Sequence, residues 1–428
     1  MAAVLRVVID ARMKDGLSGG VQQWVIGLAS ALSRLEDETE EYLFLVDEGH
    51  ETWLAPYLGG RCQLLVERTA MLVPSPGSRM ALIASRIRGA LAARFPILRT
   101  FRRRLVSRER ARWLSPLHRA ITRAGADVMH FTWQSAFATS VPSIYQPWDL
   151  QHLHLPEYFT SSERQGRETA YRAFCEQAKL VVVATKWIKA DVSAQYGIAT
   201  ERIAVVNPPP VTSAYAPPRP HEEAAIATRL ELPARYIFYP AQTWGHKNHE
   251  RLFEALGQLR RRGIAVPLVC SGHRNERYTT LMRLAEELGL ERDVMFLGFL
   301  DPTEIQVVYR RATALVFPSL YEGWGLPIVE AFAAELPVAC SNVTSLPELV
   351  GDAAIVFDPL DPDQIAVAIE RLWVDGDCRA QLVKRGRLRL SQFDWRRTAL
   401  LMRAHYRQVA GRTLDPVDTG LVAAAPLV

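Results

Sequence analysis

The sequence of 428 residues has few cysteines and no long apolar run, and both absences narrow the class of protein. Its five cysteines are odd in number and show no Cys-x-x-Cys spacing, which argues against a disulfide framework or a zinc site and for reduced thiols. No segment approaches the roughly 18 apolar residues that a membrane-spanning helix needs. Residues 4–9 read as a strand and lack the features of a signal peptide. We therefore expect a cytoplasmic protein that is not integral to a membrane.

Metal and dinucleotide motifs are missing as well. Gly19-Gly20 precedes a helical pattern, but the full Gly-x-Gly-x-x-Gly of dinucleotide-binding folds is absent. His152 and His154 have the spacing of a metal-binding pair, yet no residue stands out as a third ligand. No Asp-x-Asp stands in a convincing loop. We therefore expect neither a metal nor another cofactor.

Positive charge is concentrated in one segment. The formal net charge is +5, but residues 79–123 contain thirteen arginines and a single acid, Glu109. Apolar residues between the arginines give parts of this segment the pattern of a cationic amphipathic helix, which suits anionic lipid head groups or a phosphate-bearing acceptor. A solvated basic face explains the pattern equally well. Because stacking aromatic residues are sparse there, we expect no nucleic-acid partner.

Short apolar runs alternate with helical patterns along the chain, which predicts parallel sheets wrapped by helices. Strands are expected at 4–10, 42–46, 127–131, 143–147 and 179–184, and in a second series at 236–239, 267–270, 294–297, 314–317, 337–340 and 354–357. Proline-rich stretches near 208–220 mark a boundary between the two series. We predict an α/β protein whose parts are a first domain at 1–210 with the arginine-rich insertion, a second at 211–394, a crossover helix at 395–412 and a flexible tail at 413–428.

Open sheets of this kind bind ligands where strands lead into helices, and the turn at 317–330 carries the strongest signal. Gly323 and Gly325 let backbone N–H groups approach a ligand closely. The positive end of the following helix and its free N–H groups form an anion site. Glu322 before the helix and Glu330 in its first turn place a carboxylate on each side, which suits hydroxyls of a sugar ring and of a ribose.

Two further turns carry weaker signals. Lys247 stands at the entrance of the helix after strand 236–239, where it can neutralise a diphosphate; an ordinary exposed lysine is the alternative. Gly19 and Gly20 let the backbone of the other domain approach a phosphate or a sugar. By itself this glycine pair is a weak signal.

The segment from Glu322 to Glu330, built around Gly-Trp-Gly-Leu-Pro, resembles the E-x7-E signature of retaining glycosyltransferases of family 4. The similarity continues through Ser345-Leu346-Pro347-Glu348 and is dense over about 235–360. It implies the GT-B fold, two facing Rossmann-like domains with a C-terminal helix that returns to the first. It also implies that Glu322 contacts the transferred sugar, Glu330 binds ribose and Lys247 stabilises the leaving diphosphate. The backbone amides expected to support the sugar belong to Gly323, Trp324, Gly325 and Leu326.

The sequence departs from this family beside the expected phosphate site and at one helix end. Gln242 stands where the family has an arginine that clamps the diphosphate together with the lysine, so the second cation is unidentified; Gln242 is kept as a candidate substrate contact. Glu335 stands where the family usually has glycine, at the C-terminal end of the Glu330 helix. A carboxylate there opposes the helix dipole, and only solvent exposure or a cationic partner would account for it.

A third departure lies on the acceptor side. Trp148 replaces a histidine that the family commonly has before the Asp149-Leu150 pair. His152 or His154 is a candidate to take over contact with the sugar or the acceptor, and two ordinary loop histidines are the alternative. Asp149 and His152 are therefore candidate substrate contacts.

These observations predict a retaining hexosyltransferase that uses a UDP- or GDP-sugar donor and a glycan or lipid-linked acceptor, in bacterial surface-polysaccharide assembly. The resemblance implies front-face displacement, in which the departing diphosphate helps to deprotonate the acceptor. A location in the cytoplasm or on the inner face of the cytoplasmic membrane is expected. The alternatives are a sugar-nucleotide epimerase and a catalytically silent partner subunit. The Glu322–Glu330 pattern argues against both, while Gln242 gives the second some support.

Overall fold

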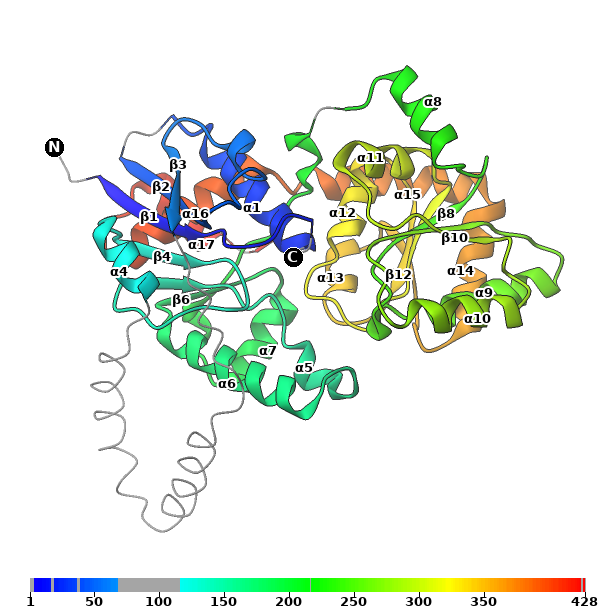
Figure 1. Cartoon of the computed structure of the whole chain (residues 1–428), viewed down its shortest axis with the longest axis horizontal. Coiled ribbons are helices and arrows are strands. Elements are labelled where there is room, and N and C mark those ends of the chain that lie inside the picture. Colours follow the sequence, from blue (N-terminus) through cyan, green and yellow to red (C-terminus); the bar gives the residue numbers. More distant parts are fainter. Residues whose placement is uncertain are drawn as a thin grey trace, which may run out of the picture.

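The computed structural model describes residues 4–16, 19–36, 39–67, 116–215, 217–424 and 426–427. They form two lobes, each built on a parallel sheet with helices around it (Figure 1). Most of the arginine-rich segment lies outside the described residues, apart from helix α4 (Pro116–Arg123). Among the described residues, no helix is long and apolar enough to cross a bilayer.

The first lobe contains a seven-stranded parallel sheet with the order β3-β2-β1-β4-β5-β6-β7. Its strands are β1 (Leu5–Asp10), β2 (Glu40–Asp47), β3 (Cys62–Glu67), β4 (Val128–Phe131), β5 (Ser143–Tyr145), β6 (Leu180–Val183) and β7 (Ile203–Val205). The order reverses between β1 and β4, as in Rossmann folds. All five predicted strands are confirmed. The two strands missed by the prediction are edge strands: β3 is partly exposed and β7 has only three residues.

Helices cover both faces of this sheet. Val7 and Ile9 of β1 pack in one core cluster with α1 and α16, while Val8 between them packs in a second cluster with α6 and α7. This alternation is the two-residue period of a strand buried on both faces. The helices between the strands are α1 (Gly19–Leu32), α4, α5 (Gln151–His154), α6 (Ser161–Gln177) and α7 (Lys186–Tyr196).

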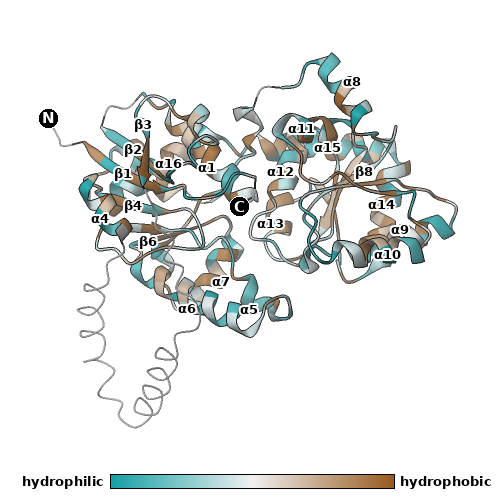
Figure 2. Cartoon of the chain, viewed as in Figure 1, coloured by the Kyte–Doolittle hydropathy of each residue, from teal (hydrophilic) through white to brown (hydrophobic). Residues whose placement is uncertain are grey.

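The second lobe repeats the design with a six-stranded parallel sheet of order β10-β9-β8-β11-β12-β13. Its strands are β8 (Ile237–Pro240), β9 (Leu268–Ser271), β10 (Val294–Phe296), β11 (Ala314–Phe317), β12 (Val338–Ser341) and β13 (Ala354–Phe357), which confirms the second predicted series. Its helices are α8 (Pro220–Arg229), α9 (His249–Arg261), α10 (Tyr278–Glu287), α11 (Pro302–Arg311), α12 (Leu326–Ala333), α13 (Leu346–Val350), α14 (Pro362–Val374) and α15 (Gly376–Leu390). In both lobes the hydrophobic strands lie between the helices, and the outer faces of the helices are polar (Figure 2).

The chain returns to the first lobe through α16 (Trp395–Ala410), which packs on α1, β1 and β4. Trp395 lies flat against Gly27 of α1, where an added Cβ would come within 1.9 Å of the indole. Its Nε1 donates a hydrogen bond to the carbonyl of Pro210 at 2.9 Å. Because glycine has no side chain, the returning helix can lie against α1 at this position. The expected pair of Rossmann-like domains with a returning C-terminal helix is confirmed.

The prediction of a flexible tail after residue 413 is wrong for helix α17 (Pro416–Ala423). Asp415 caps this helix by accepting from the N–H of Asp418 at 2.8 Å. Asp418 is fully buried and pairs with Arg403 at 3.0 Å and Arg407 at 2.6 Å, both on α16. Because a buried carboxylate needs such partners, the two arginines fix the helix in place.

Candidate active site

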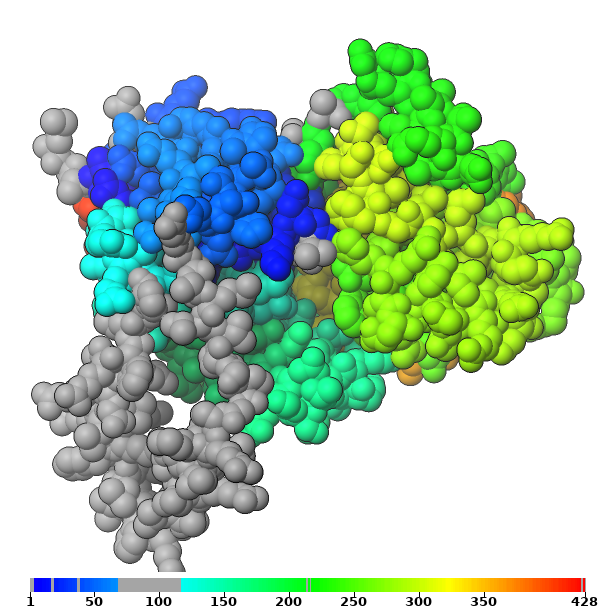
Figure 3. Space-filling model, in the orientation of Figure 1, coloured from blue at the N-terminus to red at the C-terminus, as the bar shows by residue number. Residues whose placement is uncertain are grey.

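A cleft between the lobes collects most of the strand-to-helix turns that the sequence singled out. Its first-lobe wall is formed by Gly16 and the first residues of α1. Its second-lobe wall is formed by the turns after β8, β9 and β10, by residues of α11 and by the start of α12. The segment that joins the lobes also lines it, through Tyr215 and its neighbours. In the space-filling view the dark-blue segment that follows β1 meets the second lobe along this seam (Figure 3). The predicted site residues on its wall are Gly19, Gly20, Gln242, Leu326 and Glu330.

Gly19 and Gly20, the first two residues of α1, face the start of α12 across this cleft. A Cβ on Gly20 would lie 3.7 Å from the side chain of Leu326, and one on Gly19 would meet no atom within 4 Å. Gly325 caps α12 with a φ of 101°, a conformation that favours glycine. The first amides of α12 and the positive end of its dipole therefore face a space bounded by small residues, which suits an anion.

Glu330 lies in the second turn of α12, not in the first turn as predicted, because α12 begins at Leu326. Tyr309 donates a hydrogen bond from Oη to its Oε2 at 2.8 Å. Burial raises the pKa of Glu330 to about 7, and the Tyr309 hydrogen bond opposes that rise. Near neutral pH the carboxyl group is therefore divided between its two protonation states.

Lys247 and Glu322 form the closest ion pair of the predicted site, with 2.5 Å between Nζ and Oε1. They come from the turns after β8 and β11, which are neighbours in the second sheet. The Lys247 carbonyl accepts from Tyr239 Oη at 2.7 Å. Both side chains are largely buried, with 19% and 13% exposed. The pair adjoins the cleft without forming part of the wall described above.

The backbone at Glu322 is fixed by the loop between β12 and α13. Its N–H donates to Thr344 Oγ1 at 3.1 Å, and its carbonyl accepts from Thr344 at 2.9 Å and Ser345 at 2.7 Å. Thr344 has a φ of 50°, which is rare for a β-branched residue. Such strain persists where the surrounding contacts hold it. The position of Glu322 thus depends on this loop.

The first lobe comes closest to Glu322 at Trp148 and Asp149. A Cβ on Gly323 would lie 2.8 Å from the carbonyl oxygen of Trp148 and 3.2 Å from Asp149 Cβ, so only glycine permits this approach. Burial raises the pKa of Asp149, and the negative charge of Glu322 adds to the rise, while Lys247 opposes it. Asp149, Glu322 and Lys247 therefore form one electrostatic cluster across the lobes.

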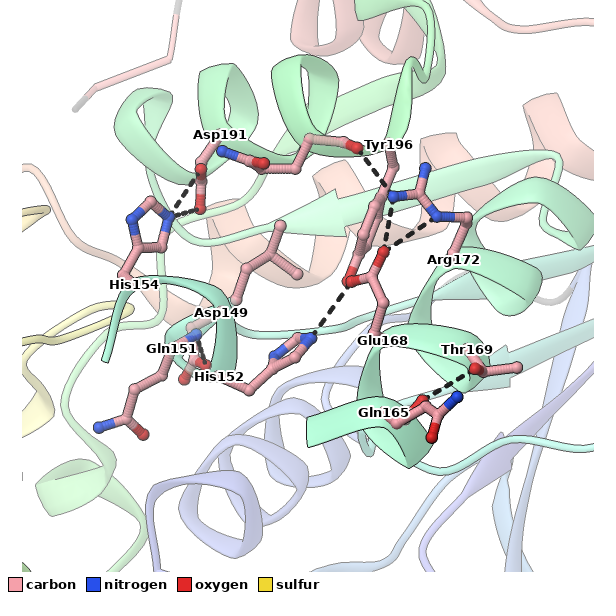
Figure 4. A network of polar contacts seen from close by, with 12 residues as sticks. Asp149, Gln151, His152, His154, Gln165, Glu168, Thr169, Arg172, Asp191 and Tyr196 are labelled. Carbon is pink, nitrogen blue, oxygen red and sulfur yellow. Dashed lines mark hydrogen bonds and ion pairs between the residues drawn. The ribbon is translucent and has the colours of Figure 1, made fainter. Parts of the chain in front are cut away.

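His152 packs against α6 and is not part of this cluster. Its ring is fully buried beside Tyr171, and its Nε2 lies 3.5 Å from Glu168 on α6 (Figure 4). Burial lowers the pKa of His152, against the influence of Glu168, so the ring is neutral at pH 7. His154 turns the other way, toward Asp191 on α7, with both carboxylate oxygens at 2.9 Å. The substrate contact of His152 therefore stays a prediction.

Two departures from the expected pattern have a structural account. Gln242 lines the cleft and accepts from Trp244 Nε1 at 2.8 Å. Glu335 has a φ of 58°, the left-handed conformation that follows many helices and explains why glycine is usual there. It forms a double hydrogen bond with Arg387, at 2.9 and 2.5 Å, the cationic partner that the sequence required. The predicted contact of Trp324 is limited to its backbone, because its indole packs in the core against Phe393.

Several cleft residues were missed. Ser271 ends β9 and Gly272-His273 follows it; His273 Nε2 donates to the carbonyl of Gly16 in the first lobe at 3.0 Å. Gly272 has a φ of 123°, and a Cβ there would lie 2.9 Å from the backbone beside Gln242. A glycine two residues after a predicted strand was the signal that would have found them. Tyr309 carries no comparable signal, because its contact with Glu330 joins two helices.

The comparison with protein-family models gives a match to the family described as "Glycosyl transferases group 1" over residues 222–389. The chain is 31% identical over 249 residues to the O-antigen chain mannosyltransferase B of Escherichia coli, which covers 58% of this chain and 65% of that one. It is 30% identical over 283 residues to the D-inositol 3-phosphate glycosyltransferase of Corynebacterium urealyticum, covering 61% and 67%. The matched regions thus span about two thirds of the length of these relatives.

Solved structures match over nearly the whole chain. The complex of Anabaena Alr3699/HepE with UDP and glucose has a TM-score of 0.68 at 17% identity and covers 94% of this chain and 100% of that one. WaaG, a glycosyltransferase involved in lipopolysaccharide biosynthesis, has a TM-score of 0.62 at 16% identity and covers 95% and 100%. At these identities the matches establish the fold, which is GT-B.

Proposed function

The chain belongs to the glycosyl transferases group 1 family, and on this premise we propose that it is a retaining glycosyltransferase. The donor is a UDP- or GDP-sugar of the hexose type, and the acceptor is a glycan or a lipid-linked glycan. Two relatives, an O-antigen chain mannosyltransferase and a serotype-specific mannosyltransferase of Escherichia coli, favour mannose and bacterial surface-polysaccharide assembly.

The observation that carries the proposal is the Lys247–Glu322 pair at 2.5 Å, held between the carboxyl ends of neighbouring strands and next to the start of α12. A diphosphate at that helix end would compete with Glu322 for the Lys247 ammonium group. The Glu322 carboxylate would then accept hydrogen bonds from the sugar hydroxyls. Glu330, farther along α12, would accept from the ribose hydroxyls. A site for a sugar nucleotide requires a positive charge beside the diphosphate and a carboxylate beside each of the two sugars.

In the proposed reaction the bond between the anomeric carbon and the diphosphate oxygen breaks, and a bond to the acceptor oxygen forms on the same face. The acceptor proton passes to the departing phosphate oxygen, and the electron pair of the broken bond stays on the diphosphate. Lys247 and the α12 amides stabilise that negative charge. The reaction as proposed needs no metal, so transfer should persist in excess EDTA; loss of transfer that Mg²⁺ or Mn²⁺ restores would contradict this part.

A thermal-shift series with UDP, GDP and their hexose conjugates tests the donor site. A ligand at 100 times its Kd should stabilise the folded protein by roughly 2.7 kcal/mol. We expect one sugar nucleotide to raise the Tm, and Lys247→Ala and Glu322→Ala to weaken that rise. Glu335→Ala, which breaks an exposed ion pair within the second lobe, is the matched control. Absence of a shift with every nucleotide in well-folded protein would instead support a silent partner subunit.

Peripheral attachment to the inner face of the cytoplasmic membrane belongs to the same proposal. It depends on the arginine-rich segment 79–123, most of which lies outside the described residues. Neutralising Arg102, Arg103 and Arg104 should reduce binding to vesicles that contain anionic lipid. Equal binding of the variant and the unmodified protein would remove the membrane from the proposal and leave the sugar transfer untouched.

A further inference from the structure

A second contact between the lobes lies outside the cleft, where α13 of the second lobe meets α7 of the first. The carboxylate of Glu348 accepts from the N–H of Lys186 at 2.8 Å and from the N–H of Trp187 at 3.0 Å. Thr185 accepts from the N–H of Ile188 at 3.1 Å. The first three amides of α7 are thus satisfied, two of them by a residue 161 or 162 positions away in the sequence.

This arrangement is unusual because helices normally satisfy their first amides with a local side chain or with water. A carboxylate at a helix N-terminus also interacts favourably with the helix dipole. Charge-assisted hydrogen bonds of this kind are the stronger ones. Glu348 therefore couples the two lobes through an element that is already formed and rigid.

A three-ring cluster lies beside this contact. Tyr321 of the second lobe stacks on His154, with ring centroids 5.5 Å apart, and meets Trp187 edge-on at 5.8 Å. Asp191 of α7 holds His154 at 2.9 Å (Figure 4). The N–H of Leu150 donates to Tyr321 Oη at 3.3 Å. Tyr321 is the residue directly before Glu322, so the cluster fixes one side of the proposed catalytic carboxylate.

The Glu348 contact fixes the other side. Thr344 and Ser345, which hold the N–H and the carbonyl of Glu322, lie four and three residues before Glu348 on the same short segment. A displacement of Glu348 would therefore also move Thr344 and Ser345, whose hydroxyl groups hold the backbone of Glu322. The second lobe also holds α13 itself, because Arg389 donates to the carbonyl of Glu348 at 2.6 Å.

From these contacts we propose that Glu348 is a positioning residue: its contact with the start of α7 joins the lobes and sets Glu322 for the reaction. The inference rests on the proposed function. It assigns Glu348 no contact with either substrate, since both of its carboxylate oxygens accept from amides of α7. Loss of the contact should therefore lower turnover and leave donor binding unchanged.

Steady-state kinetics of Glu348→Ala and Glu348→Gln test this role. A misplacement of about 1 Å at a reacting centre can cost up to about a hundredfold in rate, so we expect kcat of Glu348→Ala to fall about tenfold to a hundredfold. The Kd for the donor nucleotide should stay within about twofold, and Glu348→Gln, which keeps one acceptor oxygen, should recover part of kcat. Glu335→Ala is the control, since Glu335 pairs with Arg387 inside one lobe. A folded Glu348→Ala enzyme with unchanged kcat would overturn the inference.

A measurement that needs no activity separates this inference from the proposed function. Hydrogen exchange at the amides of Lys186 and Trp187 should be faster in Glu348→Ala than in the unmodified protein, while exchange in the core of α7 stays the same. Distances between spin labels on the two lobes should broaden in that variant. Unchanged exchange and unchanged distances would refute the contact in solution, whether or not the protein transfers sugar. Absence of transfer by the unmodified protein, with both changes present, would refute the proposed function alone.

Discussion

The turn at 317–330 in the second lobe and the loop at 146–155 in the first lobe meet at the same place but are built differently. In the turn, Glu322, Gly323 and Glu330 are fixed by one strand, one helix start and one neighbouring loop. The loop instead depends on distant packing. Trp148 has a φ of 69°, and its Nε1 donates to the carbonyl of Thr132 at 2.8 Å. Sequence spacing therefore determines the geometry of the turn, whereas tertiary contacts determine that of the loop.

This difference explains which positions sequence spacing can locate. A helix that follows a buried strand has little freedom, so the spacing of the two glutamates around Gly323 and Gly325 indicates where both lie relative to the start of α12. The short helix α5 has no such constraint, and spacing alone does not show that His152 and His154 point toward different helices. A left-handed tryptophan is even less predictable, because its strain is offset by packing against Trp24, with ring centroids 5.9 Å apart.

The largest effect is expected when the negative charge of Glu322 is removed from the turn. Glu322→Ala should lower kcat about a hundredfold to a thousandfold, a range typical for the loss of one preorganised electrostatic contact in an active site. Steady-state transfer assays measure it, with Glu335→Ala as the control for an ion pair elsewhere in the lobe. A fall of less than about threefold would show that Glu322 has no part in the reaction.

A smaller effect is expected where the turn touches the loop. An alanine at Gly323 would bring its Cβ to 2.8 Å from the carbonyl oxygen of Trp148, a backbone atom that cannot move without moving the loop. We expect kcat/KM to fall about tenfold because the lobes would meet less closely. Gly166→Ala on the exposed side of α6, where a Cβ meets no atom within 4 Å, is the matched control. Equal activity of the two variants would mean that the loop yields readily.

The protonation state of Glu330 gives a test of the turn that needs no substitution. The pKa of Glu330 in the folded protein is about 7, whereas in an unfolded chain the carboxyl group has its ordinary pKa of 4.5. Stability should therefore decrease as the pH rises from about 4.5 to about 7. Donor affinity should increase over the upper part of that range, because the ionised carboxylate accepts from both ribose hydroxyls. Thermal melts and donor titrations between pH 5 and about pH 8 measure the two trends.

Glu330→Gln is the variant that tests this assignment. The amide carries no titrating proton, so the Tm of the variant should lose the decrease that the carboxyl group causes between pH 4.5 and 7. Its donor affinity should be lower and independent of pH in the same range. If Glu330→Gln retained the pH dependence of the unmodified protein, another group would be responsible for it.

Features determined by the local sequence were predictable, whereas features determined by contacts between distant residues were not. Apolar runs located all eleven predicted strands, because a strand buried on both faces must be apolar along its length. They failed at the edge strand β3 and at the three-residue β7. Helix α17 was missed because its stability depends on the ion pairs of Asp418 with two arginines on another helix. Tyr309 was also missed because its role depends on a contact with another helix, a hydrogen bond to Glu330 that joins residues 21 positions apart.

The smallest expected effect concerns His152, and it distinguishes the loop from the turn. The sequence predicts a substrate contact, but the ring is fully buried beside Tyr171 and turns toward Glu168. Substitution by phenylalanine keeps the ring packing and removes both nitrogens, so we expect the acceptor KM and kcat to change by less than about threefold. The loss of the contact with Glu168 should cost about 1 kcal/mol, a shift of a few degrees in Tm for a protein of this size. An acceptor KM raised tenfold or more with an unchanged Tm would instead show that the loop moves on acceptor binding and brings His152 to the substrate.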